Sequence, residues 1–241
     1  AKIYDSSKIR LSDMDYELLH EGSNAVLKVN LQRGEQIKAE AGAMVAKTGH
    51  LVIEGKLWGG MVSALKRSVL GGETLFFQEV TAQEGPGEVL LAPSPPGDVK
   101  VIHISGGQDY YVKNGCLLAA MDQIEMDTKA QRLSAGAFSG AGLFVLHLKG
   151  NGGFAVSAFG AIMEINVPPG EEYMVDNGHL VAWSGDTSYR IVKAGKNWMS
   201  SIASGEGLGC RFTGPGRTYV QTRNPEAFGA WVSRFVPATG G

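Results

Sequence analysis

The sequence predicts an all-β protein built from three internal pseudo-repeats, with one short C-terminal helix. The chain holds 34 glycines among 241 residues, roughly twice the average share. High glycine content favours many tight turns and therefore many short strands. Alternating apolar and polar segments, and a thirteen-residue segment that recurs along the chain, indicate the same fold class.

The recurring segment occurs three times. "GQDYYVKNGCLLA" (107–119) and "GEEYMVDNGHLVA" (170–182) are identical at seven of thirteen positions, and "GEQIKAEAGAMVA" (34–46) keeps both glycines and the final alanine. Each copy follows an apolar segment, at 25–31, 99–104 and 161–167. In the first and third of these the apolar residues alternate with more polar ones, a period that predicts a strand with one buried face.

Each copy is predicted to contain a glycine-based turn. Asn114-Gly115 and Asn177-Gly178 favour a turn with positive φ, and the flanking valine and leucine are expected to face each other across a hairpin. The first copy has Ala41-Gly42 instead, so its turn is expected to differ. The structural turn residues are Gly34, Gly42, Gly107, Asn114, Gly115, Gly170, Asn177, Gly178, Gly72, Gly140 and Gly205.

A second motif alternates with the first. It begins "GETLFFQEV" at Gly72, "GAGLFVLHL" at Gly140 and "GEGLGCRF" at Gly205, so the six opening glycines are 30 to 38 residues apart. Regular self-similarity of this kind indicates a repeat-built architecture. We expect a single compact domain over 1–241, with units at 14–71, 72–139 and 140–204 and with 205–241 closing the last unit. An N-terminal strand is expected to complete that last unit and so remove the sheet edges.

Two segments are predicted to be helical. Within 59–72 the apolar residues lie near one face, with Lys66 and Arg67 opposite. Within 224–236, Asn224 is a candidate N-cap and Pro225 is the first helical residue. The aromatic side of this second helix is expected to dock on a sheet rather than on a membrane or a partner helix.

Composition and charge exclude several classes of protein. The net charge is −2, with 22 basic residues spread along the chain, which is unlike the basic stripe of a dedicated nucleic-acid binder. Cys116 and Cys210 are too few for a disulfide framework, and we expect both thiols to be buried in a reducing compartment. We find neither 18 consecutive apolar residues nor the apolar core of a signal peptide. We therefore expect a cytoplasmic protein without a transmembrane segment.

The side chains that carry chemistry form no recognisable motif. The five histidines lack the His-x-His spacing of a metal site. Cys116 and Cys210 lie among apolar residues, where a thiol is poorly reactive. The glycine-rich segments precede strands and lack the Lys-Ser/Thr of a phosphate-binding loop. We therefore expect no catalytic residue, no metal site and no cofactor.

The recurring motifs together resemble a known family. The Gly-x-Gly-Leu starts, the "NG-x-L-x-A" turns, "LWGGMVSALKRSVLGGETLFF" and the closing "GPG" turn are similar to the altered-inheritance-of-mitochondria family, over about residues 14–236. The resemblance implies a fold related to the tryptophan RNA-binding attenuation protein, with sandwich units of double-stranded β-helix type duplicated in one chain and further oligomerised. It also implies rings or trimers, a link of the mitochondrial relatives to inner-membrane organisation and respiratory assembly, and no established catalytic residues.

These observations favour a non-enzymatic, oligomeric β-scaffold that presents a surface to a protein or a small ligand. A homotrimer is expected by analogy with the family. The candidate interface residues are Leu57, Trp58, Met61, Val62, Leu65 and Val69. The alternatives are a nucleic-acid or membrane-surface binder and an enzyme whose site only the folded chain assembles. RNA binding is disfavoured because equivalent repeat positions hold Glu40, Lys113 and Asp176, so charge is not repeated with one sign.

Overall fold

The protein is all-β, as the sequence predicts, with one short C-terminal helix. The computed structural model describes residues 15–57, 76–131, 143–193 and 208–236. The strands are β1 (Tyr16–Leu19), β2 (Val26–Leu31), β3 (Gln36–Glu40), β4 (Met44–Lys47), β5 (Val52–Leu57), β6 (Phe76–Thr81), β7 (Gly87–Leu91), β8 (Val99–Ile104), β9 (Tyr110–Lys113), β10 (Leu117–Met121), β11 (Ile124–Gln131), β12 (Leu143–Gly150), β13 (Gly152–Ser157), β14 (Ile162–Val167), β15 (Glu172–Asp176), β16 (Leu180–Ser184), β17 (Ser188–Lys193), β18 (Leu208–Thr213) and β19 (Gly216–Gln221). Helix α2 spans Pro225–Val232, and a 3₁₀ turn, η1, spans Asn177–His179.

The strands form four antiparallel sheets that share a recurring order. The first sheet is β1-β2-β7-β4, the second β5-β6-β3-β10-β13-β8, the third β11-β12-β9-β16-β19-β14 and the fourth β15-β18-β17. From β2 onward, the described strands fall into three groups of six: β2–β7, β8–β13 and β14–β19. In each group, the first, sixth and third strands lie side by side in one sheet, and the fourth, fifth and second strands lie side by side in the next sheet. The first strands of these groups begin at Val26, Val99 and Ile162. The unit boundaries after residues 71, 139 and 204 stay a prediction.

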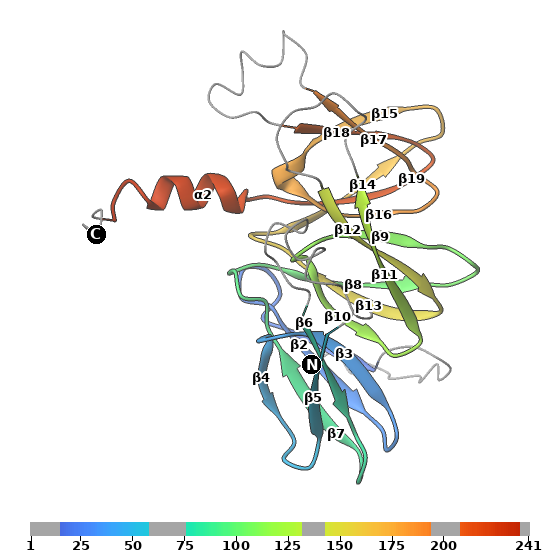
Figure 1. Ribbon diagram of the computed structural model, residues 1–241, viewed down its shortest axis with the longest axis vertical. Helices are drawn as coiled ribbons and strands as arrows, with labels where there is room; N and C mark the ends of the chain where they lie inside the picture. The colour runs from blue at the N-terminus through green and yellow to red at the C-terminus, as the bar shows by residue number, and fades with distance from the viewer. Residues whose placement is uncertain (1–14, 58–75, 132–142, 194–207, 237–241) are drawn as a thin grey trace, which may run out of the picture.

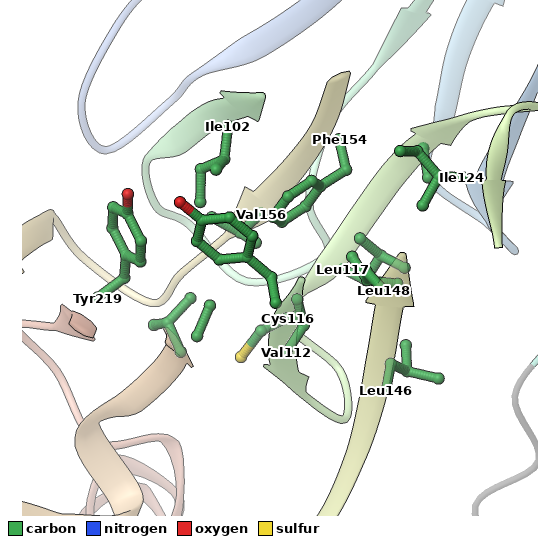
Figure 2. Close-up of a cluster of buried hydrophobic side chains, with 14 of the residues drawn as sticks. Ile102, Val112, Cys116, Leu117, Ile124, Leu146, Leu148, Phe154, Val156 and Tyr219 are labelled. Atoms are coloured by element: carbon green, nitrogen blue, oxygen red, sulfur yellow. The ribbon is translucent and has the colours of Figure 1, made fainter. Parts of the chain in front are cut away.

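Three hydrophobic clusters lie between successive sheets, because each strand turns one apolar face inward. The first cluster joins the first and second sheets through residues such as Leu27 and Ala119. The middle cluster joins the second and third sheets, and Figure 2 shows Phe154, Leu148 and Tyr219 within it. The third joins the third and fourth sheets around Trp183. The sheets follow one another along the long axis, so β4 and β15 lie at opposite ends of the molecule (Figure 1).

The glycines that open the three copies share one backbone setting. Gly34, Gly107 and Gly170 have φ of +87°, +80° and +79°. Residues with a Cβ atom rarely adopt this left-handed backbone conformation, which explains why glycine recurs at these positions. Gly72, Gly140 and Gly205, which open the second motif, lie outside the described residues.

The second turn of each copy differs from the hairpin that the sequence predicted. It connects strands of different sheets: β3 to β4, β9 to β10 and β15 to β16. Gly42 and Gly115 both have positive φ, +87° and +77°. The exceptional copy is the third, not the first, because Gly178 lies in η1, where its N–H donates to the Asp176 carboxylate at 2.7 Å. The Asx-type hydrogen bond stabilises a turn that needs no positive φ.

The predictions for the two ends of the chain were partly wrong. Strand β1 pairs with β2 in the first sheet and does not complete the last unit. Helix α2 begins as predicted, with the Asn224 side chain accepting from Ala227 N–H and Pro225 as its first residue. It buries none of its residues and projects from the sheets (Figure 1). Its Phe228 packs against Phe159, in the segment between β13 and β14, with ring centroids 5.0 Å apart. The predicted helix at 59–72 lies outside the described residues.

Candidate functional site

The second and third sheets each contain an internal joint, where strands of successive groups pair. In the first joint β3 pairs with β10, and in the second joint β9 pairs with β16. Each joint therefore continues a three-stranded half-sheet of one group into a half-sheet of the next. These joints are the sites where one six-strand group recognises another.

The first joint is closed by apolar contacts and by a buried cation. Ala39 lies opposite Ala119, and both side chains are fully buried. Lys38, only 4% exposed, donates through Nζ to the carbonyl oxygens of Asp122 at 2.8 Å and Ile124 at 3.2 Å, and it pairs with the Asp122 carboxylate at 3.4 Å. A buried ammonium needs such partners, because removing its charge from water is costly.

Stacked rings and a hydrogen bond between His147 and Asp109 close the second joint. Tyr111 lies opposite Trp183, and their rings stack with centroids 5.3 Å apart. The imidazole of His147 stacks on the other side of the Tyr111 ring at 4.4 Å and contacts the Asp109 carboxylate through Nε2. The carbonyl oxygen of Asp109 in turn accepts from the Gly185 N–H at 2.8 Å. This cluster holds β9, β12 and β16 together.

The His147–Asp109 pair is the constellation that the sequence reasoning missed. The two residues are 38 positions apart, Asp109 in the recurring segment at 107–119 and His147 in the second motif that begins at Gly140. Neither motif indicates that the two side chains meet. His147 is only 3% exposed, so its imidazole is enclosed by the joint rather than presented to a substrate. We interpret the pair as part of the joint.

The other reactive side chains of the described residues are buried or scattered. Burial raises the pKa of the Cys116 thiol and of the Cys210 thiol to about 11, which keeps both protonated at neutral pH. No group of three or more His, Cys, Asp or Glu side chains able to hold a metal ion occurs in the ranges that the structure describes. His179 donates through Nδ1 to the Gln221 carbonyl oxygen, 2.7 Å away.

One more side chain at the first joint has an altered protonation equilibrium. Glu40 ends β3, and burial raises the pKa of its carboxyl group from 4.5 to about 7. Its charge also contributes to the raised pKa of the Cys116 thiol. Lys113, the equivalent residue in the second copy, donates instead to the Asn177 carbonyl oxygen across the second joint at 3.0 Å.

The strands equivalent to the joint strands also occur at the two ends of the molecule, where no other strand of the described chain pairs with their outer sides. In the described residues, β4 pairs only with β7, and β15 pairs only with β18. We call their unpaired sides the β4 edge and the β15 edge. The β4 edge corresponds to β10 and β16 in the joints, and the β15 edge corresponds to β3 and β9.

Residues at these two edges are exposed where their counterparts in the joints are buried. On β4, Met44 is 38% exposed and Val45 is 59% exposed, whereas Leu117, Leu118, Leu180 and Val181 are at most 2% exposed. On β15, Tyr173 is 48% exposed, whereas its counterparts Ile37 and Tyr110 are at most 1% exposed. Ala46 is exposed, although the equivalent Ala119 and Ala182 are completely buried. Exposed apolar residues along an unpaired sheet edge make that edge a candidate interaction site.

The candidate interface that the sequence suggested falls almost entirely outside the described residues. Leu57 is the last residue of β5, while Trp58, Met61, Val62, Leu65 and Val69 lie outside the described residues. The turn residues of the repeat lie beside the joints: Gly42, Gly115 and Gly178 precede β4, β10 and β16. No helix within the described ranges combines the length and the apolar character that crossing a bilayer requires.

The fold and its joints define a class of protein, an all-β chain whose successive strand groups continue one another's sheets. Comparison with known proteins gives the family. Residues 16–223 match the model of the family described as Mitochondrial biogenesis AIM24, so the chain belongs to this family.

Two relatives and one solved structure are similar to the chain. An uncharacterized protein of Streptococcus pyogenes serotype M6 is 30% identical over 221 residues, which cover 89% of this chain and 88% of that protein. The mitochondrial Altered inheritance of mitochondria protein 24 of Verticillium alfalfae is 25% identical over 177 residues, 72% of this chain but 44% of that protein. A crystal structure of a Streptococcus pyogenes protein matches with a TM-score of 0.76 and 29% identity, over 92% of this chain and all of that one.

Proposed function

We propose that the protein is a non-enzymatic β-scaffold that associates with copies of itself and works by presenting binding surfaces to a protein or a small ligand. One observation carries the proposal: the β4 edge and the β15 edge expose apolar side chains at positions that are buried wherever the same strands meet inside the chain. Unpaired strand edges are templates for pairing with another chain. A homotrimer is the assembly that the family resemblance implies.

The absence of enzymatic activity is part of the same proposal. Its support is that three reactive side chains of the described residues are enclosed: His147 lies within the second joint, and the thiols of Cys116 and Cys210 are buried. A catalytic group must reach its substrate within hydrogen-bond distance. The free thiols also support a reducing, cytoplasmic location.

Native mass spectrometry of the freshly purified full chain tests this proposal. We expect a defined multiple of the 25.6 kDa protomer at micromolar concentration, and any co-purified ligand will appear as added mass. Light scattering over a tenfold dilution series provides the control for non-specific association. A clean monomer throughout this range contradicts self-assembly.

A second candidate function, binding to a membrane surface, is favoured by helix α2. The aromatic residues of α2 and of the turn after it remain exposed, with Trp231 at 54% and Phe235 at 69%. Tryptophan and phenylalanine are favoured at the apolar–polar boundary of a bilayer. Flotation with vesicles of neutral and of anionic lipids tests this function. Loss of co-flotation in the Trp231→Ala variant supports membrane binding. Co-flotation of the variant equal to that of the parent chain contradicts it.

A further inference from the structure

We infer that copies of this chain join head to tail, with the β15 edge of one copy pairing antiparallel with the β4 edge of the next copy. The pairing takes the register that both internal joints use. This inference rests on the proposed function, because a protein that remains monomeric cannot form such a joint. It adds the strands, the register and the direction of assembly.

The two internal joints have an identical register. In the first joint Ala39 lies opposite Ala119, and in the second Val112 lies opposite Ala182. Ala39 and Val112 each stand five residues after the glycine that opens their copy, and Ala119 and Ala182 each stand twelve residues after theirs. The next two pairs of each joint keep this register. They are Lys38↔Ala120 and Ile37↔Met121 in the first joint, and Tyr111↔Trp183 and Tyr110↔Ser184 in the second.

The same counting assigns partners across the proposed joint. Five residues after Gly170 is Val175, and twelve residues after Gly34 is Ala46. Val175 of one copy therefore lies opposite Ala46 of the next, Met174 opposite Lys47, and Tyr173 opposite Thr48. Tyr173 and Met174, the exposed apolar residues of β15, thereby gain neighbours on the β4 edge.

Strand β4 already has the irregular shape of a joint strand. The pairing of β10 with β13 shifts its register between Leu117 and Ala119, and that of β16 with β19 shifts between Leu180 and Ala182. The pairing of β4 with β7 shifts at the equivalent place, between Met44 and Ala46. A β-bulge re-aims the side chains of its strand. The bulged residues Leu118 and Val181 are completely buried in the joints, whereas the equivalent Val45 on β4 is 59% exposed.

The apolar packing at the two internal joints indicates which hydrophobic cluster Ala46 completes in the proposed joint. Ala119 lies in the first hydrophobic cluster and Ala182 in the middle one, so each alanine completes the cluster of the preceding group. By the same rule, Ala46 of the next copy completes the third cluster, which contains Val175. A methyl side chain is small enough to let the two strands approach, and larger residues at this position would overfill the cluster.

Charge favours the same pairing. Lys47 lies opposite Met174 in the proposed register, and Glu172 is the diagonal neighbour on the same face of β15. Diagonal positions across an antiparallel pair are within reach of long side chains. The Lys47 ammonium, which now bonds to the carbonyl oxygens of Thr48 and Gly49, can therefore also reach the Glu172 carboxylate.

The direction of assembly follows from the position of the two edges. The β4 edge and the β15 edge are different surfaces at opposite ends of the long axis, so the contact is heterologous (Figure 1). Heterologous contacts give a ring if the rotation between copies closes and a filament if it does not. Within one chain β4 cannot reach β15, so a link between these two strands joins separate copies.

Engineered disulfides test the register. Directly opposite residues of an antiparallel pair have Cα atoms about 4.5–5.5 Å apart, which a disulfide can bridge. We expect the full-length double variant Lys47→Cys/Met174→Cys to oxidise into covalent multimers, seen by non-reducing electrophoresis and by mass spectrometry of the linked peptides. The matched control is Lys47→Cys/Met163→Cys, because Met163 is at least as exposed as Met174 (53% against 40%) but lies on β14, outside the proposed joint. We expect at least tenfold less linked product from the control.

The outcomes separate this inference from the proposed function. A native oligomer whose Lys47→Cys/Met174→Cys variant links no better than the control overturns the head-to-tail joint and leaves self-assembly standing. A monomer overturns both. If the double variant does not fold, Ala46→Arg against Met163→Arg gives the same decision by native mass spectrometry: we expect the first substitution to abolish the oligomer and the second to keep it, and any other result overturns the inference.

Discussion

Arginine at Ala119 and arginine at Ala46 should have very different effects on stability, although the two positions are equivalent in the repeat. Ala119 is completely buried in the first joint, between β3 and β13. Ala46 is exposed on the β4 edge. The comparison therefore isolates the environment of a position from its sequence motif.

The expected difference follows from burial. At Ala119 a guanidinium loses its hydration at a cost of about several kcal/mol, and overpacking adds about 1–3 kcal/mol. The sum is about 5 kcal/mol or more, comparable to the whole stability of many domains, and it corresponds to a fall in Tm of about 10–20 °C for a chain of this size. At Ala46 the change in the free energy of unfolding should stay within about 0.5 kcal/mol.

Urea and thermal unfolding, followed by circular dichroism on submicromolar protein, measure both effects. Low concentration is needed because association stabilises the folded state by mass action. We expect Ala119→Arg to be unfolded or strongly destabilised and Ala46→Arg to unfold like the unmodified chain. Equal stability losses in the two variants would refute the assignment of Ala46 to an open edge, and a stable Ala119→Arg variant would refute the buried first joint.

Three further results are expected. Phe154→Ala should lower the free energy of unfolding by about 3–5 kcal/mol. The reason is that Phe154 is completely buried and its ring centroid lies 5.4 Å from that of Tyr110. A loss of less than about 1 kcal/mol in urea titrations contradicts this packing. The raised pKa of Glu40, about 7 against 4.5, means that the folded chain binds the proton more tightly, so this group's stabilising contribution is full below pH 4.5 and is lost as the pH rises through 7. Glu40→Gln should therefore be about 1–3 kcal/mol more stable than the parent at pH 8 and no more stable at pH 4, and an equal gain at both pH values excludes the carboxylate as the cause. Thiol labelling at pH 8 should be about 100-fold slower in the folded chain than in urea, since burial raises the pKa of Cys116 and of Cys210 from 9 to about 11, and rapid labelling of the folded chain contradicts that burial.

Features that depend on a few neighbouring residues were predictable. The alternation of apolar residues in 25–31 identified β2 and its buried face, because successive side chains of a strand point to opposite sides. Asn224 and Pro225 placed the start of α2 for a similarly local reason, since a cap and a fixed φ act within one helical turn. The glycines that open each copy were recognisable because their shared left-handed φ excludes most side chains.

Features that depend on partners far along the chain were not predictable in the same way. The Asn-Gly turn was expected to close a hairpin, but β9 and β10 pair with strands of different sheets. Helix α2 was expected to dock through its aromatic side, and its residues are instead exposed. In both cases the local sequence pattern is compatible with the predicted and the observed arrangement. Contacts with residues far along the chain decide between the two.

The sequence by itself determined that this protein is built of strands, where many of them begin and end, and that one turn-and-strand segment recurs in it. Only the tertiary structure decided which strands pair, that Asp109 and His147 meet at the second joint, and that Ala46 is exposed while Ala119 and Ala182 are buried. The physical reason is that side-chain alternation specifies which face of a strand is buried, whereas the hydrogen bonds at its edges can be made with any strand of matching register.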